Sequence, residues 1–166
     1  MKLDYIINYY LVFCITDGIN MNILVCIDFS GSTDDIVKKA EELAIAMSSK
    51  LWLTHITDPD PDFVGYDVGP QSVRDACSKK FHREHRQIQE IAGRLRMANI
   101  DITALLVQGP TVETILLEAS KLNAGMIVVG SHGQSAMHQL IVGSVSEGIL
   151  HKAKCPVLVV PTHCRS

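Results

Sequence analysis

From residue 21 onward the chain alternates between short apolar runs and longer amphipathic stretches, and this alternation constrains the fold more than any other feature. The apolar runs are rich in β-branched residues and only a few residues long, as in strands that are covered on both faces of a sheet. We expect five strands, over residues 22–29, 51–57, 101–107, 126–130 and 156–161.

The stretches between these runs have the apolar spacing of amphipathic helices. The first follows "DFSGST" and places Ile36 and Ala40 on one face, while Ser32 and Asp35 have the spacing of a capping box. Three further helices are expected over residues 72–98, 111–122 and 144–153.

One segment before the longest helix and one segment within it are rich in polar residues. Residues 58–70 combine proline, glycine and aspartate and are expected to form a long loop. Residues 79–87, "KKFHREHRQ", are expected to carry mostly solvated charge. His82 and His85 have a spacing that a metal can use, but no third ligand is near, so we interpret them as surface residues.

Strands that alternate with helices predict a doubly wound α/β fold, because parallel neighbours need helical crossovers. We expect a five-stranded parallel sheet in the order 3-2-1-4-5, with helices on both faces. Ligands of such sheets bind beyond the carboxyl ends of the strands, where the strand order reverses. The first and fourth strands are neighbours there, so Asp28 and Gly130 at their ends should face one crevice.

The length and charge of the chain limit the remaining possibilities. The 166 residues fit one domain, and we expect an N-terminal extension over 1–20, a domain over 21–162 and a tail over 163–166. The apolar stretch 4–15 is shorter than the ~20 residues that cross a bilayer, so no membrane span is expected. A net charge of -3 argues against nucleic acid as a partner. Five scattered cysteines without a Cys-x-x-Cys pair favour a reducing, cytoplasmic setting.

The loop between the fourth strand and the last helix has an unusual set of small residues. Gly130, Gly133 and Gly143 are followed by Ser144 and Ser146. Glycine lets the backbone approach a ligand closely, and amides at a helix N-terminus favour anions, so the set suits a phosphate chain. The alternative is that the glycines only form a turn and that Ser144 caps the helix.

Two well-known phosphate motifs are missing from the sequence. No Gly-x-Gly-x-x-Gly follows the first strand, and no lysine follows the glycines as in a P-loop. Dinucleotide redox chemistry and P-loop hydrolysis are therefore disfavoured.

The spacing Gly-x2-Gly-x9-Gly-Ser, followed by "VSEGIL" and "KCPVLVV", closely resembles the nucleotide-binding signature of the ATP-binding universal stress proteins. "ILVCIDFSGST", "LTHITD" and "MIVVGSHG" are similar to the family's first, second and fourth strands, so the likeness covers residues 21–161. Gly125 and Gly148 depart from the family pattern and bear on stability rather than on the phosphate loop.

The resemblance implies a site for ATP, ADP or AMP, with Mg²⁺ on the phosphate oxygens. Asp28 would accept a hydrogen bond from adenine or ribose, Ile56 would pack near the adenine, and the glycines and serines would surround ribose and phosphates. It also implies a homodimer through the last strand, which begins at Pro156 and ends at Val160. The implied nucleotide-binding residues are Asp28, Phe29, Ser30, Ile56, Val129, Gly130, His132, Gly133, Gly143, Ser144, Val145 and Ser146.

Three functions remain open at this stage. The first is a nucleotide-dependent regulatory or stress-response module that binds ATP without needing to turn it over. The second is a slow Mg²⁺-dependent ATP hydrolase, in which Asp28 or His132 positions a water. The third is a nucleotide-independent dimeric interaction module, against which the glycine signature weighs. Adenine rather than guanine is implied by the resemblance alone, because backbone contacts to phosphate do not read the base.

Overall fold

The computed structural model describes residues 21–57, 71–131 and 143–161, without the side chains of residues 71–76. The predicted extension over 1–20, the loop over 58–70 and the tail over 163–166 lie outside the described residues. Within the described ranges the elements are β1 (Asn22–Ile27), α2 (Thr33–Met47), β2 (Lys50–Thr57), α3 (Gln71–Met97), β3 (Ile102–Gln108), α4 (Thr111–Lys121), β4 (Ala124–Gly130), α5 (Ser144–Lys152) and β5 (Val157–Val160).

The five strands form one parallel sheet in the order β3-β2-β1-β4-β5. This order confirms the predicted doubly wound α/β fold. It places β1 between β2 and β4, with Ile27 opposite His55 and Val25 opposite Val128. The carboxyl ends of β1 and β4 are therefore neighbours, as the predicted crevice requires.

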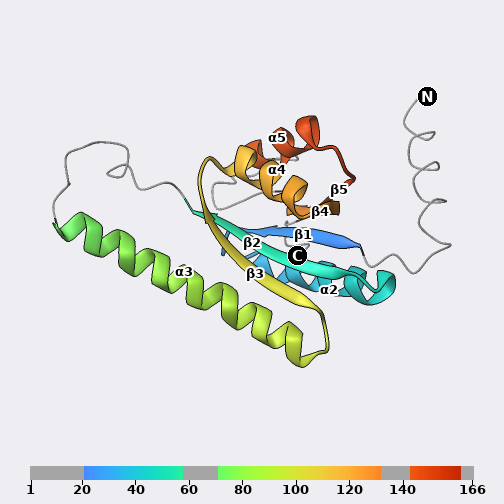
Figure 1. The fold of residues 1–166 in the computed structure, drawn as a ribbon, viewed down its shortest axis with the longest axis horizontal. Helices are drawn as coiled ribbons and strands as arrows, with labels where there is room; N and C mark the ends of the chain where they lie inside the picture. The colour runs from blue at the N-terminus through green and yellow to red at the C-terminus, as the bar shows by residue number, and fades with distance from the viewer. Residues whose placement is uncertain (1–20, 58–70, 132–142, 162–166) are drawn as a thin grey trace.

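Helices cover both faces of the sheet, with α4 and α5 on one face and α2 and α3 on the other (Figure 1). Successive residues of β1 point to opposite faces because side chains alternate along a strand. Ile23 and Val25 belong to the core under α2 and α3, and Leu24 belongs to the core under α4 and α5. The first core includes Leu51, Leu53, Ile36, Ala40, Ile88 and Ala92, and the second includes Ile127, Val129, Ile115, Ala119 and Ile149.

The predicted capping box at the start of α2 is wrong. Ser32 occupies the N-cap position, but its backbone is already helical, with φ -90° and ψ -3°, and its side chain makes no capping hydrogen bond. A capping side chain reaches the first-turn amides from an extended backbone, which Ser32 does not have. The hydroxyls of Ser30 and Ser32 instead share a hydrogen bond of 2.7 Å.

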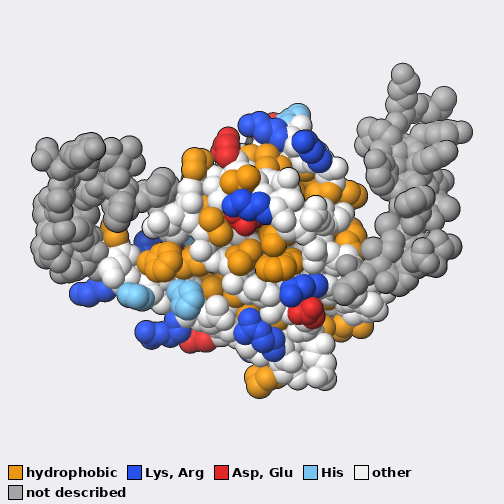
Figure 2. All heavy atoms as spheres, in the orientation of Figure 1, with side chains coloured by type: hydrophobic (Ala, Val, Ile, Leu, Met, Phe, Trp, Pro, Cys, Tyr) orange, Lys and Arg blue, Asp and Glu red, His pale blue; other side chains and the backbone are white. Residues whose placement is uncertain are grey.

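Charged side chains are spread thinly over the face seen in Figure 2. Lysines and arginines stand singly or in small groups among hydrophobic and acidic side chains, and form no continuous basic stripe on that face. In the ranges for which the structure is described, no helix is long and apolar enough to cross a membrane.

Candidate functional site

The turn after β1 is shaped by the carboxylate of Asp28. The Ser30 N–H donates a hydrogen bond of 3.0 Å to Asp28 Oδ1, which closes a small ring around Phe29. Phe29 has a φ of 56°, a conformation that is uncommon for residues other than glycine and that needs support from its surroundings. Asp28 thus holds a tight turn at the end of β1, and the strand ends at Ile27, two residues earlier than expected.

The end of β4 and the start of α5 are held together by two hydrogen bonds. Ser146 Oγ donates to the carbonyl oxygen of Gly130 over 2.6 Å, and the Gly143 N–H donates to the carbonyl oxygen of Ser131 over 2.7 Å. Ser146 is buried, so its hydroxyl fixes the helix against the strand. These bonds bring together both ends of the segment that contains His132 and Gly133, which itself lies outside the described residues.

The N-cap position of α5 is occupied by a residue without a side chain. Gly143 is the N-cap residue, with φ -62° and ψ 154°, so this position supplies no capping side chain. Ser144 and Val145, the first two helical residues, are exposed. First-turn amides carry partial positive charge and lack partners within the helix. The alternative in which Ser144 caps the helix is therefore wrong, and Gly143 is not required by a positive φ.

Apolar side chains on the sheet face covered by α4 and α5 lie near the carboxyl edge of the sheet, where the Asp28 turn is. Val129 is buried in the core under these helices, and Ile56 and Cys26 pack against that core while remaining partly exposed. Desolvation raises the pKa of the Cys26 thiol to about 12, so this cysteine remains protonated and serves as a small apolar residue.

Phe29 lies on the other face of the sheet from Ile56. Its ring packs against the core under α2 and α3, with its centroid 4.5 Å from that of His55. The structure therefore brings Asp28, Ser30, Gly130 and Ser146 to neighbouring strand ends, but it directs the Phe29 ring away from the apolar surface to which Ile56 belongs.

Sequence reasoning missed a buried polar pair beside this turn. The charged residues of 79–87 are exposed as expected, except Glu84, which is buried, as is His55. A signal was present, because Glu84 lies on the same helical stripe as Ile88 and Ile91, and His55 has the same strand parity as Leu51 and Leu53. No cluster of three or more histidines, cysteines or acidic residues that could hold a metal occurs in the part of the chain that the structure describes.

The fold and the site define a class of protein: a doubly wound α/β protein whose candidate site lies where the strand order reverses. The chain belongs to the universal stress protein family, whose model matches residues 20–161.

Individual relatives agree with this family. The chain is 33% identical over 140 residues to universal stress protein A homolog 2 of Coxiella burnetii, covering 83% of this chain and 92% of the relative. A universal stress protein solved in complex with cAMP has the same fold, with a TM-score of 0.64, 23% identity and coverage of 87% and 98%. The universal stress protein of Archaeoglobus fulgidus in complex with dAMP gives a TM-score of 0.58, 17% identity and coverage of 84% and 97%.

Proposed function

We propose that this chain is an ATP-binding universal stress protein that acts as a cytoplasmic, nucleotide-dependent regulatory module in the stress response. The observation that carries the proposal is the placement of the Asp28 turn and of the α5 N-terminus, with glycine as its N-cap residue, at the ends of adjacent strands. The Asp28 turn offers a carboxylate for the ribose or the base, and the α5 N-terminus offers backbone amides for the phosphates.

The phosphate end of the proposed site uses backbone donors. The amides of Ser144 and Val145 begin α5, and Gly130 and Gly133 allow a phosphate chain to approach the loop between them and the helix. We assign Ser146 a structural role, because its hydroxyl donates a hydrogen bond to the carbonyl oxygen of Gly130. In this proposal Ser146 positions the helix, Ser144 supplies the hydroxyl donor, and Mg²⁺ is held through the phosphate oxygens.

The base end of the proposed site uses apolar contact. Ile56 and Val129 provide side chains from β2 and β4 near the strand ends. Two structures with this fold hold cAMP and dAMP, which are both adenine nucleotides, and this favours adenine as the base. The proposed assembly is a homodimer through β5.

Nucleotide that co-purifies with the protein tests the proposal. We expect mass spectrometry of the denatured supernatant to detect ATP, ADP or AMP with the parent protein and little with Gly133→Val, because a β-branched side chain obstructs phosphate approach. The matched control is Gly93→Val on α3, where an added Cβ meets no described atom within 4 Å, and it should retain nucleotide. Equal nucleotide in the parent and Gly133→Val would contradict the assignment of the loop.

Phosphate release separates the proposed module from the two alternatives. With Mg²⁺ and ATP we expect release to be slow or absent, since the proposed role requires occupancy alone. Steady release that is lost in Asp28→Asn would instead identify the slow hydrolase. A dimer that binds no nucleotide would identify the nucleotide-independent interaction module.

A further inference from the structure

The strand at the end of the sheet opposite β5 is β3, and its outer edge carries backbone groups that do not pair with β2. Asp101 accepts a hydrogen bond from β2 just before the strand begins, and the Gly109 N–H donates one to β2 just after it ends. The pairing between them runs without a bulge. Because orientation alternates along a strand, the N–H and C=O groups of Ala104 and Leu106 point away from β2.

The outer edge of β3 has little of the protection that edge strands usually carry. The strand, Ile102–Gln108, contains no charged residue and no proline, and its register is regular. Arg96 Nε donates to the carbonyl oxygen of Ile102 over 3.1 Å, which covers the first outward group. The outward groups of Ala104 and Leu106 follow further along the strand. An edge of this kind pairs readily with another strand.

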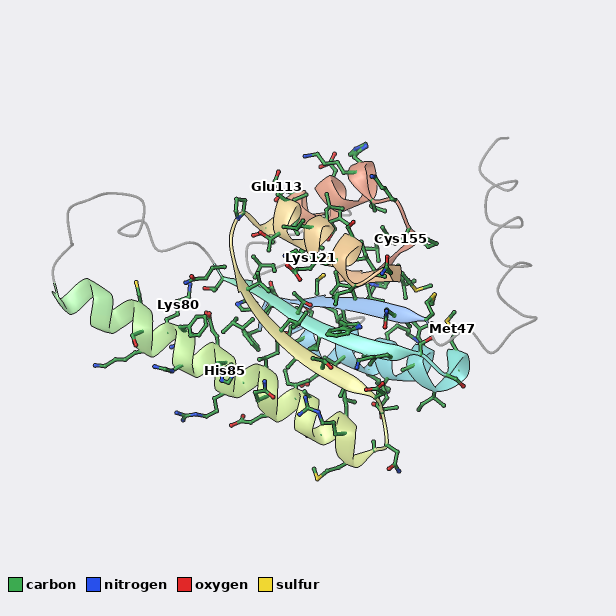
Figure 3. The ribbon with its side chains drawn as sticks, in the orientation of Figure 1. Met47, Lys80, His85, Glu113, Lys121 and Cys155 are labelled. Atoms are coloured by element: carbon green, nitrogen blue, oxygen red, sulfur yellow. The ribbon has the colours of Figure 1, made fainter. Side chains whose placement is uncertain are left out.

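An apolar strip of side chains lies beside this edge. Leu105 and Val107 are half-buried on the sheet face that α4 and α5 cover, but α4 packs mainly against β2 and β4, and α5 against β5. Neither side chain belongs to the two cores that the described residues form. Figure 2 shows hydrophobic side chains gathered over β3 and β2, and in Figure 3 β3 crosses between α3, where His85 is labelled, and α4, where Lys121 is labelled. An added strand would therefore cover apolar surface as well as pair backbone groups.

The chain itself contains a segment with the composition of such a strand. Residues 5–15, "YIINYYLVFCI", lie outside the part of the chain that the structure describes. They combine β-branched and aromatic residues, which pack well on a pleated surface, and they contain no charge, proline or glycine. Only Asn8 interrupts the apolar composition, so a strand of these residues would be apolar on both faces. Such a strand suits a position with α3 on one side and the Leu105 and Val107 strip on the other.

The connection from this segment to β1 is long enough for pairing with β3. Met21 precedes β1 at the amino edge of the sheet, and its carbonyl oxygen accepts from the Lys50 N–H of β2 over 3.0 Å. A strand outside β3 lies three strand spacings from β1, about 14 Å. Residues 16–20 span up to about 17 Å when extended. Because residue 15 would then lie at the amino edge, the added strand would run antiparallel to β3, an arrangement common at the edge of parallel sheets.

We propose that residues 5–15 pair with β3 of the same molecule as a sixth, antiparallel strand of the sheet. β3 is favoured over β5 because its seven residues offer a longer partner than the four residues of Val157–Val160. A sheet that is open at both edges can add copies at each edge and grow without limit. Closing the β3 edge leaves β5 as the edge at which a second copy can pair. This pairing does not depend on nucleotide.

Amide hydrogen exchange followed by NMR tests the pairing in the full chain. The N–H groups of Ala104 and Leu106 should exchange at least about tenfold more slowly in the parent than in the double variant Leu11→Pro/Val12→Pro, because hydrogen-bonded amides exchange only when they open. One of two adjacent N–H groups in a strand faces its partner, so the two prolines break the pairing whatever its register. The Leu105 N–H faces β2, so it should exchange alike in both proteins and report that the sheet is intact.

The matched control is Thr16→Pro/Asp17→Pro, which places two prolines in the connection, where pairing needs no N–H. It should keep the slow exchange of Ala104 and Leu106. In the parent, nuclear Overhauser contacts should also join residues 5–15 to β3.

Fast exchange of Ala104 and Leu106 in the parent would overturn the proposal. Slow exchange that persists in the double variant of residues 11 and 12 would also overturn it, since another part of the molecule would then cover the edge. Protection that disappears on dilution would identify a second copy as the occupant instead. If the same prolines speed the exchange of Val157 or Val159 and leave β3 unchanged, the segment pairs with β5 and the assignment to β3 is wrong.

Discussion

At the scale of single residues, the carboxyl edge of the sheet depends on backbone conformations that few residues adopt. Gly109 follows β3 with a φ of 152°, and its N–H donates to the carbonyl oxygen of Thr57 at the end of β2 over 3.2 Å. The space where a Cβ would lie is occupied by the hydroxyl of Thr114. A side chain at Gly109 would therefore both strain the backbone and collide with α4.

Gly109→Ala should lower the free energy of unfolding by about 2 kcal/mol, from positive-φ strain and the displaced threonine. Urea denaturation measures this through Trp52, the single tryptophan of the chain. The control is Gly31→Ala, an exposed turn glycine whose Cβ meets no described atom within 4 Å, and it should change stability by less than about 0.5 kcal/mol. Similar urea midpoints for the two variants would contradict this prediction, because Thr114 and the backbone would then adapt to the new side chain without a loss of stability.

At the scale of elements, two helices contain an interior glycine in different surroundings. An added Cβ at Gly93 of α3 meets no described atom within 4 Å, whereas at Gly148 of α5 it lies 3.0 Å from Cγ2 of Val112 on α4. Gly148 lowers helix propensity, but it lets α5 approach α4 closely. The glycine at this position therefore has a packing reason.

Gly93→Ala and Gly148→Ala test this reason as a pair, since both gain the same helix propensity. Gly93→Ala should stabilise the protein by roughly 0.5–1 kcal/mol. Gly148→Ala should show no gain or a loss of up to about 1 kcal/mol, because overpacking against Val112 opposes the propensity. Thermal unfolding followed by circular dichroism compares them, and equal stabilisation by both would mean that α4 and α5 move apart freely.

The fold was predictable because it follows from rules that act over whole elements. Apolar periodicity located the strands and helices, and the crossover rule ordered β1 next to β4, so Asp28 and Gly130 were expected at neighbouring strand ends. What could not be predicted depends on individual contacts. The hydroxyl of Ser32 bonds to that of Ser30 instead of the helix amides, and the hydroxyl of Ser146 donates to the Gly130 carbonyl. Sequence spacing does not show such neighbouring hydrogen-bond partners, so neither contact could be predicted.

At the scale of the whole molecule, β5 is an edge strand of the sheet, and no other described strand pairs with its outer side. The Ile127 N–H donates to the carbonyl of Pro156, and the Ser131 N–H donates to that of Val160, so these carbonyls face β4. Because orientation alternates along a strand, the backbone polar groups of Val157 and Val159 point away from β4. An apolar edge of this kind favours pairing with another strand. Ser131 also follows Gly130 directly, so the edge and the candidate phosphate loop share a hydrogen bond, as a regulatory dimer would need.

Val159→Pro removes an outward N–H while leaving the hydrogen bonds between β4 and β5 intact, and proline is tolerated at such edge positions. If the proposed homodimer pairs through β5, light scattering after size exclusion should give a dimer for the parent and a monomer for Val159→Pro at micromolar concentration. Val159→Thr keeps both the N–H and the β-branched shape, so it should remain dimeric, and circular dichroism should show that all three proteins are folded. A folded Val159→Pro that dimerises like the parent would place the interface elsewhere. The hydrogen bond between Ser131 and Val160 would then stabilise the fold of one subunit only.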